Sequence, residues 1–579
     1  MHRVHLPLGL VVLTACPVEQ TYADLINEHG NTYWTESTGT TGDSASGAAS
    51  GNPGAPTSTN ASGASAAEGD SSGETAGITG GSTSLGDGSS GDDSSSTTLL
   101  EIDEPPQIGV LEVSPTPVLA AGFVDLNVEC SDDVAVAEVR FLVDGEILAA
   151  VTDAPFAAMW MVKSQDQIGD HTLSAECEDS AGQVALSGEE ISVALPAPGS
   201  VAWSRVYQAE KWYAEAADAA AAPDGSWWVC GYADNEVGGT AVWVAHYSPA
   251  GTELFSKTIS RGKDQTGRCS GIDVASDDGH RAVLTGGYGP TGLWPSLWTA
   301  LVDETEVQPV LAESDETLTG YWGNDVLVNK YGQFEVAGQR IVNGDDMDMA
   351  HQIYNYIPNE KVLTAAGGMT YGDLNGPDIA SAIVENPDGT VTLVGTAVKD
   401  NRLTAAAIKL DAQHQVVEEN GWPFKAILPF PQGAGALDGS VDALGNLKLS
   451  GWWRESPNNT SRILTVTIDP LGNLLGALVI EPMMTGDDAG VGVTFLSDGT
   501  TVTVASVTTA APENLDMWLR RGQEKGGLLF QGPYNLRDEP RRVRANVFDQ
   551  TLVVGFETAA VLQDGMPVPV RRAWLRAFN

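Results

Sequence analysis

The chain is poor in basic residues. Lys and Arg together number 30, against 77 Asp and Glu, which gives a formal net charge of −47. Between Pro17 and Val139 there is no Lys or Arg at all. A polyanion repels the phosphates of nucleic acids, so the composition excludes a nucleic-acid partner.

Motifs of common enzyme chemistry are also missing. The folded part has no His-Glu-x-x-His, Cys-x-x-Cys, Gly-x-x-x-x-Gly-Lys or Gly-x-Ser-x-Gly. The segments Ser276–Gly279 and Ser497–Gly499 lack the spacing of sialidase Asp boxes. We therefore assign no catalytic residue, and a non-enzymatic role is favoured.

Cysteine is scarce, and the first one lies next to an export signal. A basic start, a run of about ten apolar residues and a small-residue end precede Cys16, which is too short to span a bilayer stably. Leu13-Thr-Ala-Cys16 resembles the lipobox of bacterial lipoproteins, in which cleavage leaves an acylated Cys at the N-terminus. Residues 1–16 are then a lipoprotein signal peptide, and Pro17, which is not Asp, favours the outer membrane. The alternative is an ordinary signal peptide with an incidental Cys.

Residues 17–104 form a low-complexity linker, which from about Gly39 to Thr98 is almost entirely Ser, Thr, Gly, Ala and Asp. Such a composition cannot bury a core, so we expect disorder. Its physical role is a tether between a lipid anchor and folded domains.

Residues 105–196 alternate apolar and polar side chains in two stretches that each end in Cys, 124–130 and 171–177. This period predicts half-buried strands. With Ser114-Pro115, Asp132-Asp133, Phe141-Leu-Val-Asp-Gly145 and Asp179-Ser-Ala-Gly182, the segment resembles bacterial Ig-like domains. The resemblance implies a β-sandwich that serves as a spacer or an adhesive module.

Residues 200–579 contain a repeat. A turn, a short apolar run and a small residue recur about every 55 residues, a period typical of repeat architectures. The closing positions are Gly231, Gly286, Gly338, Gly395, Gly451, Ser506 and Gly555. Each unit divides into four strand-length runs without a helix-period segment, and Asp-Gly pairs predict type I′ hairpins. We predict an all-β chain ending in a seven-bladed β-propeller.

The ends of this region predict how the ring closes. The seventh unit lacks a fourth strand, and Val201–Tyr207 resembles the fourth strand of the first unit. We expect Val201–Tyr207 to pair with Arg571–Phe578, leaving no open edge. The alternative is an open array of hairpins. The repeats resemble the delta-60 type of myxobacterial secreted proteins, a family defined by its scaffold, with Ala407–His414 and Val466–Gly472 as examples.

The four remaining cysteines fit an oxidising compartment. Cys130 and Cys177 end strands that would face each other in a sandwich, whereas Cys230 ends the second strand of the first unit and Cys269 begins the first strand of the second unit. Two disulfides are expected; the alternative is four buried thiols.

Several polar clusters are candidates for binding. Arg541, Arg542 and Arg544 begin the inner strand of the seventh unit and are the candidate ligand-binding residues, unless they pair with nearby acids such as Asp538 and Glu539.

The acidic loops 345–348 and 373–378 suit Ca²⁺ weakly, so no cofactor is assigned. His246, His280, His351 and His414 fall in four different units, from which we expect no shared metal site. The paired tryptophans, Trp227-Trp228 and Trp452-Trp453, are expected in the core.

The combined prediction is a lipoprotein of the cell envelope, periplasmic or surface-facing. Its propeller face would bind a protein or glycan, as a binding or scaffold module. Two alternatives remain: a lyase or glycoside-acting hydrolase with a site at the channel mouth, and a structural component of an envelope assembly.

Overall fold

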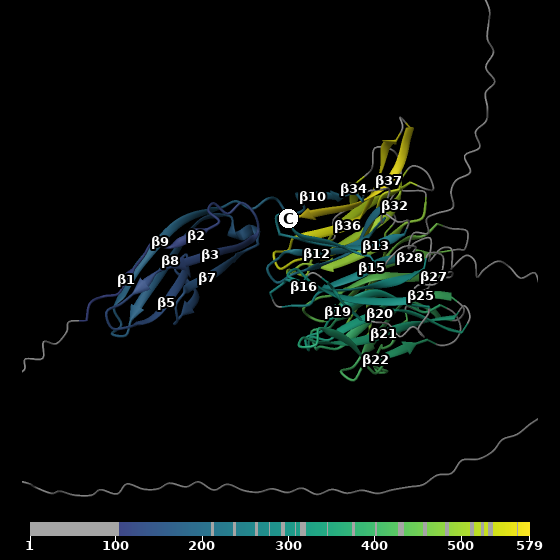
Figure 1. The fold of residues 1–579 in the computed structure, drawn as a ribbon, viewed down its shortest axis with the longest axis horizontal. Coiled ribbons are helices and arrows are strands. Elements are labelled where there is room, and N and C mark those ends of the chain that lie inside the picture. The colour runs from purple at the N-terminus through teal and green to yellow at the C-terminus, as the bar shows by residue number, and fades with distance from the viewer. Residues whose placement is uncertain are drawn as a thin grey trace, which may run out of the picture. The chain divides into compact units, whose positions relative to one another are not determined.

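The computed structural model describes residues 103–579 except 210–212, 235–238, 261–264, 277, 291–295, 307, 313–319, 344–345, 373–376, 400–401, 426–432, 456–459, 481–485, 510–513, 523–525, 531–536 and 564–565. In these residues the regular elements are strands, apart from the 3₁₀ helix η1 (Gln165–Gln167), so the all-β prediction is confirmed (Figure 1). None of their helices is long and apolar enough to cross a membrane. The predicted signal peptide, Cys16 and the linker to residue 102 lie outside the described residues.

Residues 107–193 form a sandwich of antiparallel sheets. A three-stranded sheet has the order β2 (Glu112–Ser114), β3 (Gly122–Val128), β7 (Phe156–Val162). A four-stranded sheet has the order β6 (Glu146–Val151), β5 (Val136–Val143), β8 (Gly169–Asp179), β9 (Val184–Val193). The short strands β1 (Gln107–Ile108) and β4 (Cys130–Ser131) pair with each other.

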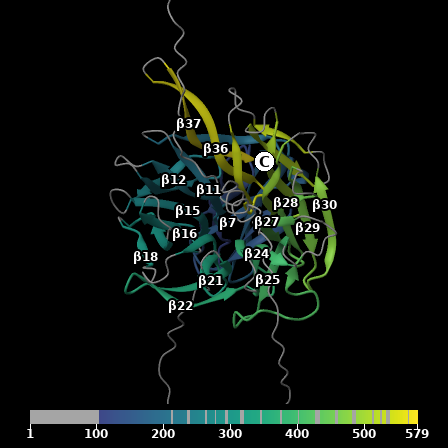
Figure 2. The same ribbon diagram turned by 90° about the vertical axis from the view of Figure 1, so that its right-hand side faces the viewer.

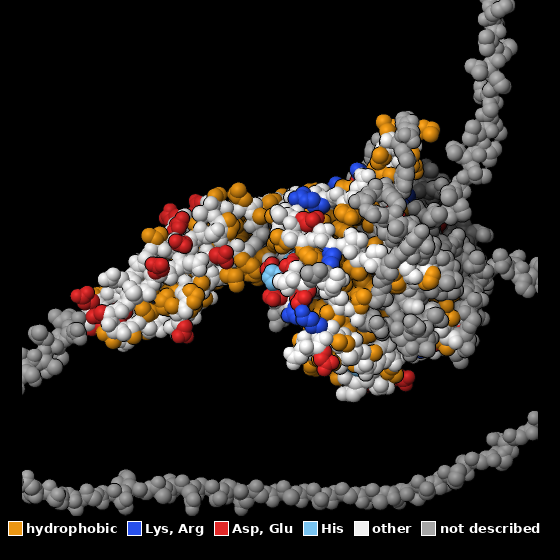
Figure 3. Space-filling view, viewed as in Figure 1, with side chains coloured by type: hydrophobic (Ala, Val, Ile, Leu, Met, Phe, Trp, Pro, Cys, Tyr) orange, Lys and Arg blue, Asp and Glu red, His pale blue; other side chains and the backbone are white. Residues whose placement is uncertain are grey.

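The sandwich core follows from the alternation seen in the sequence. Val124, Leu126, Leu173 and Ala175 are fully buried, while polar residues between them face outward. Figure 3 shows acidic side chains over the surface of this sandwich. Cys130 and Cys177 form the expected disulfide, with their Cα atoms 6.4 Å apart.

Residues 201–578 form seven groups of four antiparallel strands, which we number as sheets in chain order (Figure 2). The first contains β11 (Ala214–Ala221), β12 (Trp227–Asp234), β13 (Thr240–Tyr247) and β14 (Glu253–Ile259). The second contains β15 (Gln265–Val274), β16 (Arg281–Pro290), β17 (Ser296–Asp303) and β18 (Val310–Ala312). A parallel bridge between Thr240 and Thr266 joins these two sheets.

The remaining sheets repeat this order. The third is β19 (Tyr321–Val328), β20 (Phe334–Asn343), β21 (Asp346–Ile357), β22 (Val362–Tyr371); the fourth β23 (Ile379–Glu385), β24 (Val391–Lys399), β25 (Arg402–Leu410), β26 (Phe424–Lys425); the fifth β27 (Gly433–Val441), β28 (Leu447–Arg454), β29 (Arg462–Ile468), β30 (Leu474–Ile480); the sixth β31 (Ala489–Phe495), β32 (Thr501–Thr508), β33 (Leu515–Arg521), β34 (Gly527–Phe530). The seventh has the order β10 (Val201–Tyr207), β37 (Met566–Phe578), β36 (Thr551–Gln563), β35 (Glu539–Ala545).

The seventh sheet contains the pairing predicted from the sequence. β10 lies antiparallel to β37, with Arg205 opposite Leu575 and Tyr207 opposite Ala573. The backbone N–H of Asn579 donates to the carbonyl of Ser200, 2.9 Å away. A segment that precedes the first sheet therefore supplies the outer strand of the last one.

The first strands of the seven sheets contact one another in sequence. β11 contacts β15, and the same relation continues through β19, β23, β27, β31 and β35; β35 in turn contacts β11. Trp227, Trp228 and Trp243 are fully buried in the clusters that pack the first sheet against its two neighbours, as expected for this tryptophan pair.

The Asp-Gly turns differ from the predicted type. Gly225 has φ of +82°, but Asp224 is not among the positive-φ residues, whereas a type I′ turn needs both. The N–H of Gly225 donates to the carbonyl of Ala222, and the N–H of Ala222 donates to that of Ser226. This pattern fits a type I turn followed by a left-handed residue, the three-residue hairpin with a bulge. In the seventh sheet Asp549, at φ of +59°, takes the glycine position.

Candidate functional site

Each first strand contains a register shift at an equivalent position, and the residue after it differs between sheets. It is an aspartate in the first, third and fifth sheets: Asp218, Asp325 and Asp438. It is a small residue in the second, fourth and sixth: Gly271, Ala382 and Gly492. In the seventh sheet it is Arg542. Bulges re-aim side chains, so seven equivalent positions are turned toward the neighbouring first strands.

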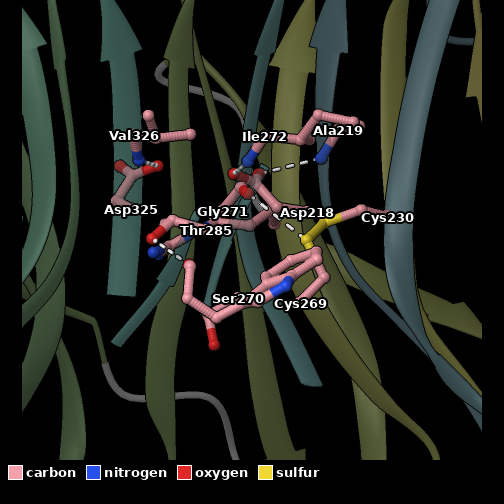
Figure 4. The surroundings of a disulfide bond; sticks show 12 residues. Asp218, Ala219, Cys230, Cys269, Ser270, Gly271, Ile272, Thr285, Asp325 and Val326 are labelled. Carbon is pink, nitrogen blue, oxygen red and sulfur yellow. Dashed lines mark hydrogen bonds and ion pairs between the residues drawn. A yellow bond between two sulfur atoms is a disulfide. The ribbon is translucent and has the colours of Figure 1, made fainter. Parts of the chain in front are cut away.

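The three aspartates each bind the backbone of the next sheet. Asp438 Oδ2 accepts from the N–H of Val493 at 2.9 Å, and Asp325 Oδ2 accepts from that of Ile383 at 3.1 Å. Asp218 lies between Ala219 and Ile272, whose N–H groups both point at its carboxylate (Figure 4). At the junctions between sheets, these carboxylates thus take the place of a strand carbonyl as the hydrogen-bond acceptor for the backbone amides.

The second disulfide lies beside this junction. Cys230 of β12 and Cys269 of β15 are joined, with Cα atoms 5.9 Å apart (Figure 4). The expected bridge between the first and second sheets is therefore confirmed. Two disulfides fit an oxidising, extracytoplasmic compartment.

Arg542 and Arg544 fill the space between these aspartates. Arg544 reaches Asp218 with Nη2 at 3.2 Å and Asp438 with Nη1 at 3.1 Å. Arg542 donates to the carbonyls of Leu437, at 2.6 Å, and Ser381, at 2.8 Å. The two guanidinium groups of the seventh sheet therefore connect the first, fourth and fifth sheets.

Arg541 belongs to a separate group of polar residues. Its Nε donates to Glu215 Oε1 at 2.5 Å and its Nη1 to Glu539 Oε2 at 3.1 Å. The hydroxyls of Tyr213 and Tyr232 donate to the other oxygen of Glu215, at 2.8 and 3.0 Å. Arg541 and Arg542 are thus held by the chain's own acceptors, but their partners are mostly distant acids and carbonyls; of the two acids named from the sequence, only Glu539 pairs with Arg541. A ligand-binding role for Arg541, Arg542 and Arg544 stays a prediction.

Burial shifts the titration of the central carboxylates. It raises the pKa of Asp325 to about 7, and the charge of Asp218 adds to this effect. Burial also raises the pKa of Asp273 to about 6. For Glu215 burial is outweighed by the Arg541 and Arg571 cations, so its pKa lies below the ordinary value. Burial thus raises the pKa of Asp325 and Asp273, whereas the neighbouring arginines lower the pKa of Glu215.

A second polar network contains Ser226, His246 and Glu304. Ser226 Oγ lies 2.6 Å from His246 Nε2, and His246 Nδ1 bonds to Glu304. This order resembles a serine-hydrolase triad. However, Ser226 is fully buried and its hydroxyl bonds to Asp224 Oδ1 at 2.5 Å, while the His246 ring stacks on Trp228. The hydroxyl has no access to a substrate, so the network stabilises the turn.

The histidines are not isolated from one another, contrary to the expectation from their separate repeats. His246 and His280 share the carboxylate of Glu304. His351 of β21 and His414, in the turn after β25, have ring centroids 5.4 Å apart and both face Glu335. Sequence reasoning missed these pairs because it placed each residue within its own sheet, whereas the contacts lie between sheets.

The two candidate calcium loops are only partly described. Residues 345 and 373–376 lie outside the described residues. Asp378 Oδ1 accepts from the N–H of Val398 at 2.7 Å, and Asp348 is buried in β21. In the described part of these loops, one carboxylate oxygen of Asp378 therefore accepts a backbone hydrogen bond within the protein. Ca²⁺ binding stays untested.

Comparison with known proteins identifies one domain. Residues 113–175 match the bacterial Ig domain family. Together with the disulfides this match indicates an extracytoplasmic protein. No curated protein sequence matched the chain.

Solved structures resemble parts of the chain at low overall similarity. A fibronectin(III)-like module of CbhA from Clostridium thermocellum is 25% identical, covers 16% of this chain and 100% of that module, and has a TM-score of 0.14. A protein of unknown function from Dyadobacter fermentans is 10% identical over 66% of this chain and 100% of its own, with a TM-score of 0.39. The β-propeller domain of the Trilobed protease from Pyrococcus furiosus is 8% identical over 63% of this chain and 93% of its own, with a TM-score of 0.35. At these scores the structural likenesses carry no argument, and the family match applies to residues 113–175 alone.

Proposed function

We propose that the seven sheets form a seven-bladed β-propeller of the delta-60 type. Two observations support this proposal: the first strands contact one another in a cycle from β11 to β35 and back, and β10 completes the last sheet. The bulge aspartates and Arg542 would then lie around the propeller axis, where paired charges fill the centre.

The chain would be held at the cell envelope by lipid on Cys16. The Leu13-Thr-Ala-Cys16 sequence and the low-complexity linker after it support this anchor, and residues 17–104 would then serve as the tether. The acyl chains and the length of the tether would place the Ig-like sandwich and the propeller outside the cytoplasm, at the outer membrane.

The proposed function is that of a scaffold that binds an envelope protein. One observation carries it: the outer strand β30 exposes an apolar surface. Leu474, Leu475 and Leu478 are 46%, 60% and 45% exposed, and among the described strands β30 pairs with β29 alone. Large apolar side chains on an unpaired edge mark a place where another chain adds a strand.

The comparison with β14 strengthens this interpretation. β14 is the outer strand of the first sheet and carries the charged residues Glu253 and Lys257, which protect an edge from pairing. β30, Leu-Leu-Gly-Ala-Leu-Val-Ile, has no charge along its length. The chain therefore protects one edge and leaves an equivalent edge open.

The enzymatic alternative has less support. Buried carboxylates with raised pKa values would favour it. Yet Asp218, Asp325 and Asp438 each accept backbone N–H groups, and Asp218 and Asp438 also pair with arginines. Their protein contacts occupy the oxygens that a substrate would need.

Capture from envelope extracts tests the scaffold. The full-length exported chain is immobilised as wild type, as the double variant Leu475→Lys with Leu478→Lys, and as the control Leu254→Lys on β14. We expect one protein to be captured by wild type and control and to fall at least tenfold with the double variant, because two cations oppose strand addition. Circular dichroism verifies that the variants fold.

Equal capture by the double variant would exclude β30 as the binding edge. Capture of a glycan alone would contradict a protein scaffold altogether.

A further inference from the structure

Three ligand-type side chains converge between the third and fourth sheets. They are Glu335 of β20, His351 of β21 and His414 of the turn that follows β25. Glu335 Oε2 lies 2.8 Å from His351 Nε2 and 3.7 Å from His414 Nδ1. One ligand atom from each residue lies within 4.8 Å of the other two. Glu335 and His351 are each 1% exposed.

A neighbouring amide orients the carboxylate. Asn329 Nδ2 donates to Glu335 Oε1 at 2.6 Å, which leaves Oε2 to face the two imidazoles. His414 Nδ1 is buried and has no hydrogen-bond partner, although it points toward that oxygen. Outer partners of this kind fix the ligands of metal sites.

His414 also occupies a backbone position that disfavours it. Its φ is +58°, and the turn closes with its N–H donating to Asp411. The equivalent turn positions in the first and fifth sheets hold Gly251 and Gly472, at φ of +77° and +83°. A residue with a β-carbon costs about 1 kcal/mol or more in this conformation, a cost that Lys361 and Asp549 also meet in their own turns.

The scaffold does not itself require these side chains. The next pair of sheets repeats the arrangement: Asn386 Nδ2 donates to Thr392 Oγ1 as Asn329 donates to Glu335. Ala407 pairs with Val394 as His351 pairs with Ala337. Gly472 holds the turn position of His414. Where the third and fourth sheets together place Glu, His and His, the fourth and fifth sheets therefore place Thr, Ala and Gly.

We propose that Glu335, His351 and His414 bind a divalent transition-metal ion of the Zn²⁺ class and so clamp the third sheet to the fourth. Two imidazoles and a carboxylate are ligands that Zn²⁺ accepts at about 2.0–2.2 Å, and three protein ligands leave one position for water. Imidazole ligands favour Zn²⁺, Cu²⁺ and Ni²⁺ over Ca²⁺ and Mg²⁺.

Calorimetric titration of Zn²⁺ into the metal-stripped full-length chain tests the site. Wild type is expected to bind one equivalent, with a rise in Tm. His414→Gly is the key variant, because glycine suits the backbone at this turn: its metal-free Tm should equal or exceed that of wild type, while Zn²⁺ affinity falls at least 100-fold. His351→Gln should also weaken binding at least tenfold.

His280→Gln is the matched control, since His280 shares Glu304 with His246 outside this cluster. It should leave Zn²⁺ affinity and the visible spectrum of the Co²⁺-loaded chain unchanged, whereas His414→Gly should remove that spectrum. Absence of Zn²⁺ binding by wild type, or full binding by His414→Gly, would overturn the proposal. Loss of binding in His280→Gln alone would assign the metal to Glu304.

Discussion

The first, third and fifth sheets carry Asp218, Asp325 and Asp438 at the bulge of their first strands, whereas the second, fourth and sixth carry Gly271, Ala382 and Gly492. The aspartates reach forward to backbone amides of the next sheet. The small residues allow close approach: a β-carbon at 271 would lie 2.5 Å from the Cα of Asp325, and one at 492 would lie 2.8 Å from the nitrogen of Val543. From the first sheet to the sixth, the bulge position thus alternates between an aspartate that bonds across the junction and a small residue that permits close packing.

Removal of one bulge aspartate should have the largest effect. Asp438→Ala leaves the Val493 amide without its acceptor and Arg544 without one of its two carboxylates. Loss of one partner from a buried ion pair costs about 3–5 kcal/mol of unfolding free energy. Denaturation with guanidinium chloride measures this loss of unfolding free energy. The surface pair Glu306–Lys361 is the control, where Glu306→Ala should cost at most about 1 kcal/mol. Equal losses in both variants would contradict a special role for the junction.

Enlargement of an even-sheet residue should have the next largest effect. Gly271→Ala forces a methyl group against the backbone of Asp325 and Val326. Overpacking of this kind costs about 1–3 kcal/mol, measured by the same denaturation. Gly476→Ala in β30, where a β-carbon meets nothing within 4 Å, should change stability by about 0.5 kcal/mol or less. A neutral Gly271→Ala would show that the small residues are not required for close approach.

The pH dependence of stability gives a third test of this comparison. The pKa of Asp325 is raised to about 7 in the folded state, against about 3.9 in unfolded chains. A raised pKa means that the folded state binds the proton more tightly. This contribution is complete below about pH 4 and is lost as the pH rises through 7. Unfolding free energy should therefore fall between pH 4 and 8.

Asp325→Asn should flatten this slope, because the amide keeps the acceptor for Ile383 but does not titrate. Thermal denaturation across that range compares the two proteins. An unchanged slope would mean that Asp325 titrates near its ordinary pKa and is not the source of the pH dependence.

The features that sequence analysis predicted correctly are local or periodic. The period of the closing residues located the second strand of every sheet, and the likeness between Val201–Tyr207 and the fourth strand of the first unit identified β10 as the partner of β37. Both disulfides followed from strand ends.

The features it missed depend on which residues meet across sheets. Asp218 and Asp438 are far apart in sequence, yet Arg544 bridges them. His351 and His414 likewise come from adjacent sheets, and no local pattern pairs them. One signal was available: His414 stands at the turn position where the fifth sheet has Gly472, although the left-handed backbone there favours glycine.

The pairing of β10 with β37 also constrains the order of events during synthesis. Translation delivers β10 before the strands of the first six sheets, while its partner β37 follows all of them. For most of that interval Val201–Tyr207 has no strand to join, and chain growth proceeds from the N-terminus at a finite rate. Completion of the seventh sheet must therefore wait until Met566–Phe578 has been synthesised, and a chain that stops before β37 leaves both β10 and β36 without their shared partner strand.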